Sequence, residues 1–295
     1  MKVLLTGRGG QLGQALIASA PPGIALIATG RQELDLSDPE ACSAAVRDSR
    51  PDWVLNAGAY TAVDQAESEP VLAHAVNAGA PAAFAQALAQ TGGRMLQLST
   101  DFVFNGAQGH PYQVNQQRAP LGVYGTSKAA GEQAVVECLG GEGDERAAIL
   151  RTSWVYGPVG RNFLLTMLRL HRLKAEAQES LCVVEDQVGC PTATPGLAQA
   201  CWSVIQQQVT GLHHWSDAGA ASWYDFAVAI GELAVARGLM SDAAAVQPIS
   251  TADYPTPAQR PSYSLLECSV SRRRLGLPAQ HWRSALQDVI ASLDG

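Results

Sequence analysis

A glycine-rich turn close to the start of the chain constrains the fold more than any other segment. The apolar run Val3 to Leu5 leads directly into Thr6-Gly-Arg-Gly-Gly-Gln-Leu-Gly13, and an alanine- and leucine-rich stretch follows. Glycines at Gly7, Gly10 and Gly13 allow a tight turn, close approach to a pyrophosphate, and close packing of a helix on a strand. The N–H groups and positive dipole end of that helix suit phosphate. The sequence therefore predicts a dinucleotide-binding strand–turn–helix unit.

Short apolar runs alternate with alanine-rich stretches through the first half of the chain. Strands are predicted at residues 3–5, 24–28, 53–56, 95–99 and 147–153, and helices over 12–20, 39–48 and 70–91. These strands are apolar on successive residues, which is typical of a parallel sheet covered by helices on both faces. Asp38 before Pro39 predicts an N-cap followed by proline at the first helical position. We therefore expect an α/β fold with a Rossmann-type, doubly wound parallel sheet.

The second half of the chain differs in composition. After Tyr156-Gly157-Pro158 the sequence is richer in loop-forming residues, and the segment 254–261 is irregular because of its prolines. We therefore expect a dinucleotide-binding domain over residues 1–153, to which later segments can return. A smaller C-terminal lobe over residues 154–295 is expected to bind mainly the substrate.

Charge and residue spacing exclude several classes of partner. The 20 Lys and Arg residues face 27 Asp and Glu residues, so a net charge of −7 provides no basic field for a nucleic acid polymer or an acidic membrane. No window of 18 or more residues is continuously apolar, and the opening segment is too short for a signal sequence. The six cysteines lie far apart without metal-ligand spacing. We expect a cytoplasmic protein with reduced thiols and no metal site.

The end of the second predicted strand bears on which dinucleotide is bound. NAD enzymes usually place a carboxylate there to hold the ribose 2′-hydroxyl. This chain has Arg31 at that point, and a guanidinium can pair bidentately with a 2′-phosphate. NADPH is therefore the expected cofactor, with NADH possible. In the alternative interpretation, Glu33 or Asp35 supplies the carboxylate and Arg31 is simply solvated.

A tyrosine and a lysine with helical spacing are the candidate catalytic residues. Tyr124 and Lys128 are four residues apart, so on a helix they lie on the same face. A nearby cation stabilises phenolate, which favours acid–base exchange with a carbonyl oxygen. Thr100, 24 residues before Tyr124, ends a predicted strand, where ligands of open α/β sheets bind. Taken alone, this spacing is also compatible with a tyrosine and a lysine that lie on the surface and have no catalytic role.

Several segments resemble one enzyme superfamily in order and spacing. The glycine turn, Asn56–Ala59, Ser99-Thr-Asp101 and Tyr124-x-x-x-Lys128 match the extended short-chain dehydrogenase/reductases. Within that superfamily, further segments look like the dTDP-4-dehydrorhamnose reductases: Ala59–Asp64, Ser99–Phe104, Arg151–Tyr156, Asp186–Thr192 and Tyr254–Pro261. The similarity runs over nearly the whole chain.

The resemblance implies reduction of the C4 ketone of dTDP-4-dehydro-L-rhamnose to dTDP-L-rhamnose. Tyr124 would be the proton donor, and Lys128 would hold the nicotinamide ribose and lower the Tyr124 pKa. Thr100 and Asp101 would bind the sugar near the ketone, and Trp154 would form a wall of the sugar site. Trp154 could instead be an ordinary core residue, because large aromatic side chains dominate protein cores.

The resemblance also implies cofactor contacts and an assembly. Residues expected at the cofactor are Gly10, Gln11 and Leu12 at the phosphates, Asp35 and Leu36 at the adenine, and Ala59, Tyr60 and Thr61 beside the bound molecule. Arg260 either clamps the diphosphate of the nucleotide-sugar substrate or is solvated. Some family members bridge a dimer through magnesium held partly by a glutamate two residues beyond the third glycine. Ala15 stands there, so a monomer or a homodimer without a bridging metal is expected.

Four other functions are alternatives to this one. Dehydratases of the superfamily carry a glutamate directly after the Thr-Asp pair, and Phe102 at that place cannot transfer a proton. Another nucleotide-sugar 4-reductase or an epimerase could use the same Tyr124 and Lys128. A non-catalytic NADP-binding regulatory subunit is the alternative of another class, which the retained tyrosine, lysine and glycines disfavour.

Overall fold

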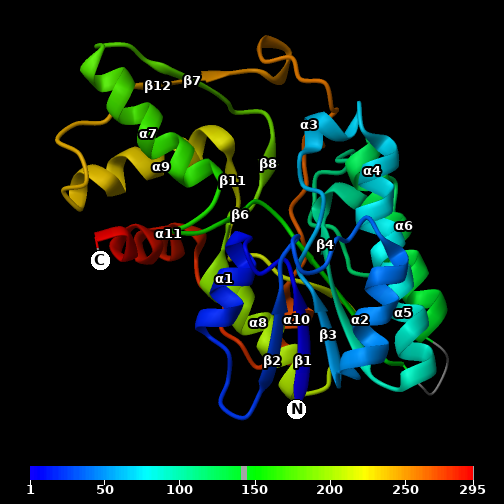
Figure 1. The fold of residues 1–295 in the computed structure, drawn as a ribbon. Coiled ribbons are helices and arrows are strands. Elements are labelled where there is room, and N and C mark those ends of the chain that lie inside the picture. Colours follow the sequence, from blue (N-terminus) through cyan, green and yellow to red (C-terminus); the bar gives the residue numbers. More distant parts are fainter. Residues whose placement is uncertain (141–144, 295) are drawn as a thin grey trace.

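A parallel sheet forms the centre of the larger of two lobes in the computed structural model, which describes residues 1–140 and 145–294 (Figure 1). Its six strands run in the order β10-β5-β4-β3-β1-β2. They are β1 (Lys2–Thr6), β2 (Ala25–Thr29), β3 (Trp53–Asn56), β4 (Arg94–Thr100), β5 (Ala147–Thr152) and β10 (Gly211–His214). Every neighbouring pair is parallel. The predicted doubly wound α/β fold is confirmed, with the strand order reversing between β1 and β3.

Helices cover both faces of this sheet (Figure 1). On one face lie α1 (Gln11–Ala18) and α8 (Thr194–Gln206), and on the other lie α2 (Pro39–Ser49), α5 (Ala80–Thr91) and α6 (Val123–Leu139). The indole of Trp202 in α8 donates to Leu16 O in α1 at 3.2 Å, which joins two helices far apart in the sequence. Burial of both sheet faces explains why the strands are apolar on successive residues.

Local signals set the helix starts. The Asp38 carboxylate accepts from Glu40 N at 2.9 Å and Ala41 N at 3.1 Å, so the predicted N-cap of α2 is confirmed. The helix predicted over 70–91 is three elements instead: α4 (Pro70–His74), the π-helix η1 (Ala75–Gly79) and α5. A short helix α3 (Val63–Ala66) and a 3-10 turn η2 (Asp101–Val103) complete this lobe's first half.

The smaller lobe is built from three helices and short strands. Its helices are α7 (Phe163–Glu176), α9 (Trp223–Ala236) and α11 (Trp282–Ala291). The strands are β6 (Val155–Tyr156), β7 (Leu181–Val184), β8 (Val188–Gly189), β9 (Thr192–Ala193), β11 (Ala221–Ser222) and β12 (Val246–Ile249). Tyr156, Phe226 and Trp282 are at the centre of a separate apolar core. The 3-10 turns η3 (Thr251–Asp253) and η4 (Ser292–Asp294) and helix α10 (Ser269–Leu275) complete the chain.

Segments of the second half of the chain also contribute to the larger lobe. Strand β10 pairs with β5, helix α8 packs on α1, and α10 contacts both β10 and α8. The domain division at residue 153 stays a prediction, and β10 and α8 are later segments that return to the sheet. His213 and His214 lie in the edge strand β10.

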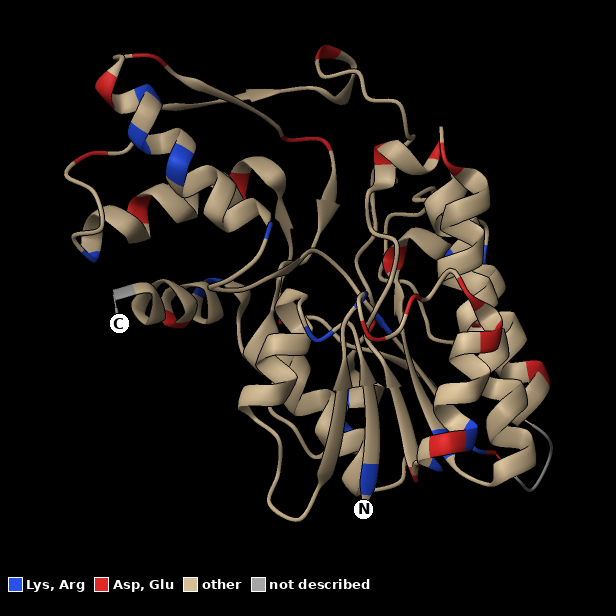
Figure 2. Cartoon of the chain, viewed as in Figure 1, with Lys and Arg blue, Asp and Glu red and all other residues tan. Residues whose placement is uncertain are grey.

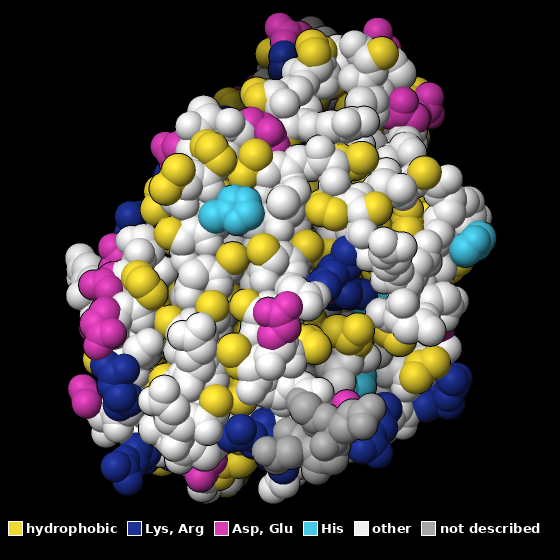
Figure 3. Space-filling model, turned by 90° about the vertical axis from the view of Figure 1, so that its right-hand side faces the viewer, with side chains coloured by type: hydrophobic (Ala, Val, Ile, Leu, Met, Phe, Trp, Pro, Cys, Tyr) yellow, Lys and Arg dark blue, Asp and Glu magenta, His cyan; other side chains and the backbone are white. Residues whose placement is uncertain are grey.

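The surface carries mixed charge. Figure 2 shows Lys and Arg in small groups over both lobes, with Asp and Glu between them. Figure 3 shows the side of the molecule on which α4, α5 and α6 lie. Positively and negatively charged side chains are both present there, among scattered hydrophobic ones. Within the described ranges, none of the helices is long and apolar enough to cross a membrane.

Candidate active site

A cavity of about 1020 Å³ opens where the strand order reverses, at the carboxyl ends of β1, β2 and β3. Ligands of open α/β sheets bind at this position. All residues predicted to contact the cofactor line it: Gly7, Gly10, Gln11, Leu12, Gly13, Arg31, Asp35, Leu36, Ala59, Tyr60, Thr61 and Lys128. Tyr124 lines the same cavity. Thr100, Asp101, Trp154 and Arg260 lie outside this lining.

The glycine turn leaves no room for side chains. A Cβ on Gly13 would lie 2.1 Å from Gly7 O, and one on Gly7, whose φ is +75°, would lie 2.8 Å from the Gly58 backbone. Gly10 N donates to Gly7 O at 2.9 Å and closes the turn. Helix α1 begins without a side-chain cap, so its first N–H groups are available to an anion in the cavity. This cradle fits the diphosphate of a dinucleotide.

Arg8, from the glycine turn, lies beside Arg31 and Glu33, which follow β2, on the cavity wall. Arg8 Nη2 pairs with Glu33 Oε1 at 2.6 Å, and Glu33 Oε2 accepts from Gly30 N at 2.9 Å. Arg31 is exposed on the same wall of the cavity. Asp35 accepts from Ser37 N and Oγ, and these bonds hold the pKa of the Asp35 carboxyl below its usual value. The sequence interpretation missed Arg8; its position inside the glycine turn was the signal.

Helix α6 brings Tyr124 and Lys128 to the cavity. Lys128 is buried, and its Nζ donates to Leu98 O at the end of β4 at 2.7 Å. Burial lowers the pKa of Lys128 to about 8, while the nearby Glu132 carboxylate acts in the opposite direction. Removal from water raises the pKa of Tyr124 to about 12, against a smaller effect of the Thr100 hydroxyl. Burial is the largest influence on the Tyr124 pKa here, since Lys128 Nζ is directed to the Leu98 carbonyl, and the role of Lys128 in lowering that pKa stays a prediction.

Thr100 and Asp101 lie close enough to Tyr124 to affect its pKa. Thr100 Oγ1 donates to Asp101 Oδ1 at 3.1 Å and accepts from Phe102 N at 3.2 Å. Burial raises the pKa of Asp101 to about 6, and a hydrogen bond from the Ser264 hydroxyl acts in the opposite direction. The Phe102 ring meets the Tyr124 ring edge-on at 5.6 Å between centroids. The residue that would be an acid in a dehydratase is therefore an apolar support for the tyrosine.

Trp154 is part of a stack of indoles. Its ring lies parallel to that of Trp223, 3.6 Å between centroids and 7° apart. A Cβ on Gly189 would lie 2.8 Å from the Trp154 ring, and Trp154 itself has a φ of +45°. These contacts place Trp154, directly before β6, against α9 and β8 of the smaller lobe.

Arg260 joins the two lobes. Its Nη1 and Nη2 donate to the two Asp64 carboxylate oxygens on α3 at 3.0 and 2.8 Å. Ala258 N adds a third bond to Asp64, at 3.2 Å. The segment 251–261, here named the interlobe strap, thus runs from the end of β12 to α3 (Figure 1). The interpretation of Arg260 as a merely solvated side chain is wrong.

Over residues 1–140 and 145–294, no group of three or more His, Cys, Asp and Glu side chains is arranged to hold a metal ion. All six cysteines are free, and four of them are buried.

Comparison with known proteins identifies the family of this chain. A family model described as the RmlD substrate binding domain matches residues 1–294. A dTDP-4-dehydrorhamnose reductase of Sinorhizobium fredii is 37% identical over 99% of this chain and 98% of its own length. The chain belongs to the dTDP-4-dehydrorhamnose reductase family.

Solved structures of this reductase family have the same fold. The crystal structure of a dTDP-4-dehydrorhamnose reductase from Clostridium acetobutylicum superposes with a TM-score of 0.90 at 34% identity, covering 100% of both chains. The family member from Bacillus anthracis, solved in complex with NADP, gives a TM-score of 0.88 at 32% identity over 99% of both chains. The two-lobed arrangement around the cavity is therefore that of the family.

Proposed function

We propose that this chain is a cytoplasmic reductase that uses NADPH, or NADH, to reduce the C4 ketone of dTDP-4-dehydro-L-rhamnose to dTDP-L-rhamnose. The observation that carries the proposal is the placement of Tyr124 and Lys128 on the wall of the cavity that contains the glycine turn. The names of the family members support the substrate.

Tyr124 is the proposed proton donor. Burial raises its pKa to about 12, so its hydroxyl is protonated at neutral pH, and a neighbouring cation is needed to bring the pKa nearer to neutral pH, where proton transfer to a ketone oxygen is most efficient. Lys128 provides the nearby ammonium and holds the nicotinamide ribose, and Thr100 donates to the same substrate oxygen by giving up its bond to Asp101 Oδ1. The cofactor, when bound, supplies the hydride.

The cavity residues have proposed cofactor roles. Gly10, Gln11 and Leu12 bind the diphosphate at the start of α1, where backbone N–H groups face the cavity. Asp35 and Leu36 contact the adenine, and Ala59, Tyr60 and Thr61 flank the bound molecule. Arg31, together with Arg8, binds the 2′-phosphate of NADPH, for which a guanidinium is well suited.

The proposed substrate residues come from both lobes. Asp101 binds the sugar, Trp154 forms a wall of its site, and Arg260 contacts the diphosphate. Because the Arg260 guanidinium is paired with Asp64, a diphosphate would have to share it or displace the carboxylate. The assembly proposed is a monomer or a homodimer without a bridging metal, since Ala15 has no ligand atom.

The test follows NADPH absorbance with purified protein and dTDP-4-dehydro-L-rhamnose, beside the unepimerised 4-keto sugar. Oxidation that depends on the epimerised substrate and yields dTDP-L-rhamnose is the expected result. The Tyr124→Phe variant should lose kcat by about 100-fold or more, since general acid catalysis contributes about 10²–10⁴-fold, while its NADPH affinity stays near that of the wild type.

The other functions predict different results in the same assay. An epimerase would interconvert sugars without net NADPH consumption, and a regulatory subunit would bind NADPH without oxidising it. Near-normal kcat in Tyr124→Phe would remove the tyrosine from its proposed role.

A further inference from the structure

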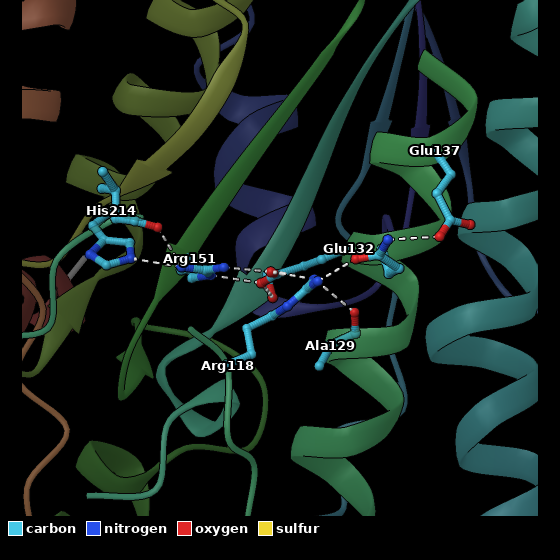
Figure 4. A network of polar contacts seen from close by, with 9 residues as sticks. Arg118, Ala129, Glu132, Glu137, Arg151 and His214 are labelled. Atoms are coloured by element: carbon cyan, nitrogen blue, oxygen red, sulfur yellow. Dashed lines mark hydrogen bonds and ion pairs between the residues drawn. The ribbon is translucent and has the colours of Figure 1, made fainter. Parts of the chain in front are cut away.

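A buried ion pair lies on the same helix face as the catalytic candidates. Glu132 follows Lys128 by four residues and Tyr124 by eight on α6, so the three side chains share one face. The Glu132 side chain is completely buried and that of Arg151, on β5, is 2% exposed. Arg151 Nε and Nη2 donate to the two carboxylate oxygens at 2.8 and 2.7 Å in a bidentate pair (Figure 4).

The Glu132 carboxylate also binds the ends of other elements. The Ser99 hydroxyl donates to Oε1 at the carboxyl end of β4, directly before Thr100. Arg118 Nη1, from the loop before α6, donates to Oε2 at 3.2 Å and to Ala129 O at 3.0 Å. One carboxylate thereby joins α6, which carries Tyr124 and Lys128, to β4, which carries Thr100, and also to β5 and to that loop.

Arg151 is fixed on its other side as well. Its Nη1 donates to Val114 O at 3.0 Å and lies 3.3 Å from His214 Nε2 on β10. The guanidinium carbon lies 5.1 Å from the centre of the Phe104 ring. Neither Glu132 nor Arg151 lines the cavity. Their effect on the reaction must therefore pass through the groups that they hold.

We propose that Glu132 and Arg151 are positioning residues, which fix the register of α6 against β4 and β5 so that Tyr124, Lys128 and Thr100 converge on one substrate oxygen. This inference rests on the proposed function of Tyr124 and Lys128. A bidentate arginine–carboxylate pair fixes geometry more tightly than an apolar contact of similar volume.

The pair also acts on Lys128 through its charge. The titratable groups around Lys128 and Glu132 are Tyr124 on α6, Asp101 in η2, Arg118 in the loop before α6, Arg151 on β5 and His214 on β10. The Glu132 carboxylate favours the charged form of Lys128. Removing that negative charge lowers the Lys128 pKa, so the loss of activity at high pH should begin at lower pH.

The first variant is Glu132→Gln, with Glu137→Gln as the matched control. Glu137 is on the same helix and exposed, where it accepts from Gln133 at 2.7 Å, so its substitution removes the same charge outside the buried pair (Figure 4). Misplacement of reacting groups by about 1 Å costs about 100-fold in rate, and a kcat loss of about 10- to 100-fold is expected for Glu132→Gln. NADPH affinity at pH 7 should stay near wild type, and the alkaline limb of kcat should move to lower pH.

The second variant, Arg151→Lys, keeps the positive charge but loses the planar guanidinium that binds both Glu132 oxygens. It should lower kcat while leaving the alkaline limb of the profile near that of the wild type, because the Glu132 carboxylate remains. It carries the test if Glu132→Gln does not fold by circular dichroism. A kcat that falls only in proportion to the folded fraction, with an unchanged pH profile in Glu132→Gln, overturns the proposal.

Failure of the proposed function gives a different signature. If none of the 4-keto sugars supports NADPH oxidation by the wild-type protein, the reductase assignment fails. The positioning of α6 can still be measured in that case. Amide hydrogen exchange over residues 123–132 should then be faster in Glu132→Gln than in Glu137→Gln. Equal exchange in the two variants overturns the positioning role.

Discussion

At the scale of single residues, the side chains at the end of β2 are those we propose to select the dinucleotide. Arg8, Arg31 and Glu33 stand together there, and Glu33 already pairs with Arg8 and with Gly30 N. A ribose 2′-hydroxyl can donate to the Glu33 carboxylate, whereas a 2′-phosphate is repelled by it and attracted by both guanidinium groups. The site therefore contains elements suited to each cofactor.

Single substitutions at this site distinguish a site for the 2′-phosphate of NADPH from a site for the 2′-hydroxyl of NADH. Arg31→Ala and Arg8→Ala should each weaken NADPH binding by about tenfold or more, since hydrogen bonds to charged groups contribute about 1.5–3 kcal/mol. NADH binding should change much less. Fluorescence titration of both cofactors against both variants measures the ratio, and equal losses for NADPH and NADH would show that neither arginine contacts the 2′-phosphate.

Residue spacing predicted which side chains meet in the cavity, but not their state of protonation. The four-residue spacing of Tyr124 and Lys128 correctly placed both in the cavity. Their pKa values depend on burial by surrounding elements, which that spacing does not encode. Pairs distant in sequence, such as Asp64 with Arg260, were equally invisible, because many carboxylates could have met that arginine.

At the scale of elements, the strand–turn–helix unit of β1 and α1 was the strongest prediction because its requirement is steric. Gly13→Ala would place a Cβ 2.1 Å from Gly7 O, whereas a Cβ on Gly9 meets nothing within 4 Å. Without cofactor, Gly13→Ala should lose about 1–3 kcal/mol of unfolding free energy through overpacking.

Gly9→Ala is the matched substitution, and its unfolding free energy should stay close to that of the wild type. Urea unfolding of both variants, monitored by circular dichroism, makes the comparison. If both variants were equally stable, the crowding between α1 and the turn would not determine the residue at position 13.

The break between α4 and α5 was not predictable from helical periodicity. The side-chain amide of Asn77, in the π-helix η1, accepts from Tyr60 N and donates to Tyr60 O and to Ser127 Oγ on α6, the last at 3.0 Å. A Cβ on Gly131 would lie 2.1 Å from Asn77 O, so η1 and α6 are in close contact. These tertiary bonds, which join the loop beside the cavity to α6, accompany the local widening of the helix.

At the scale of the whole molecule, the interlobe strap spans the two lobes through Asp64. Asp64→Asn should weaken this attachment and speed amide exchange in residues 251–261, with exposed Asp48→Asn as the control. The Arg260 guanidinium holds the pKa of the Asp64 carboxyl below its usual value of 3.8. The contribution of the pair to stability is thus present above pH 3.8 and lost as the pH falls through the lowered pKa.

Hydrogen exchange measured by mass spectrometry tests this prediction. Unchanged protection of the strap in Asp64→Asn would mean that the remaining contacts, such as those of Thr251 with Asp186, suffice to hold it. The strap would then be an appendage of the smaller lobe.

The return of β10 and α8 to the sheet affects how the protein is made. During synthesis, the first 152 residues leave the ribosome with β5 as an open edge and without Leu197 and Trp202 to cover the face beside α1. Both α8 and β10 must be translated before that edge and face are complete. The nascent chain thus passes through an interval in which unpaired backbone and apolar surface are open to chaperones or to other chains. Truncation before residue 211 would leave the β5 edge unpaired permanently.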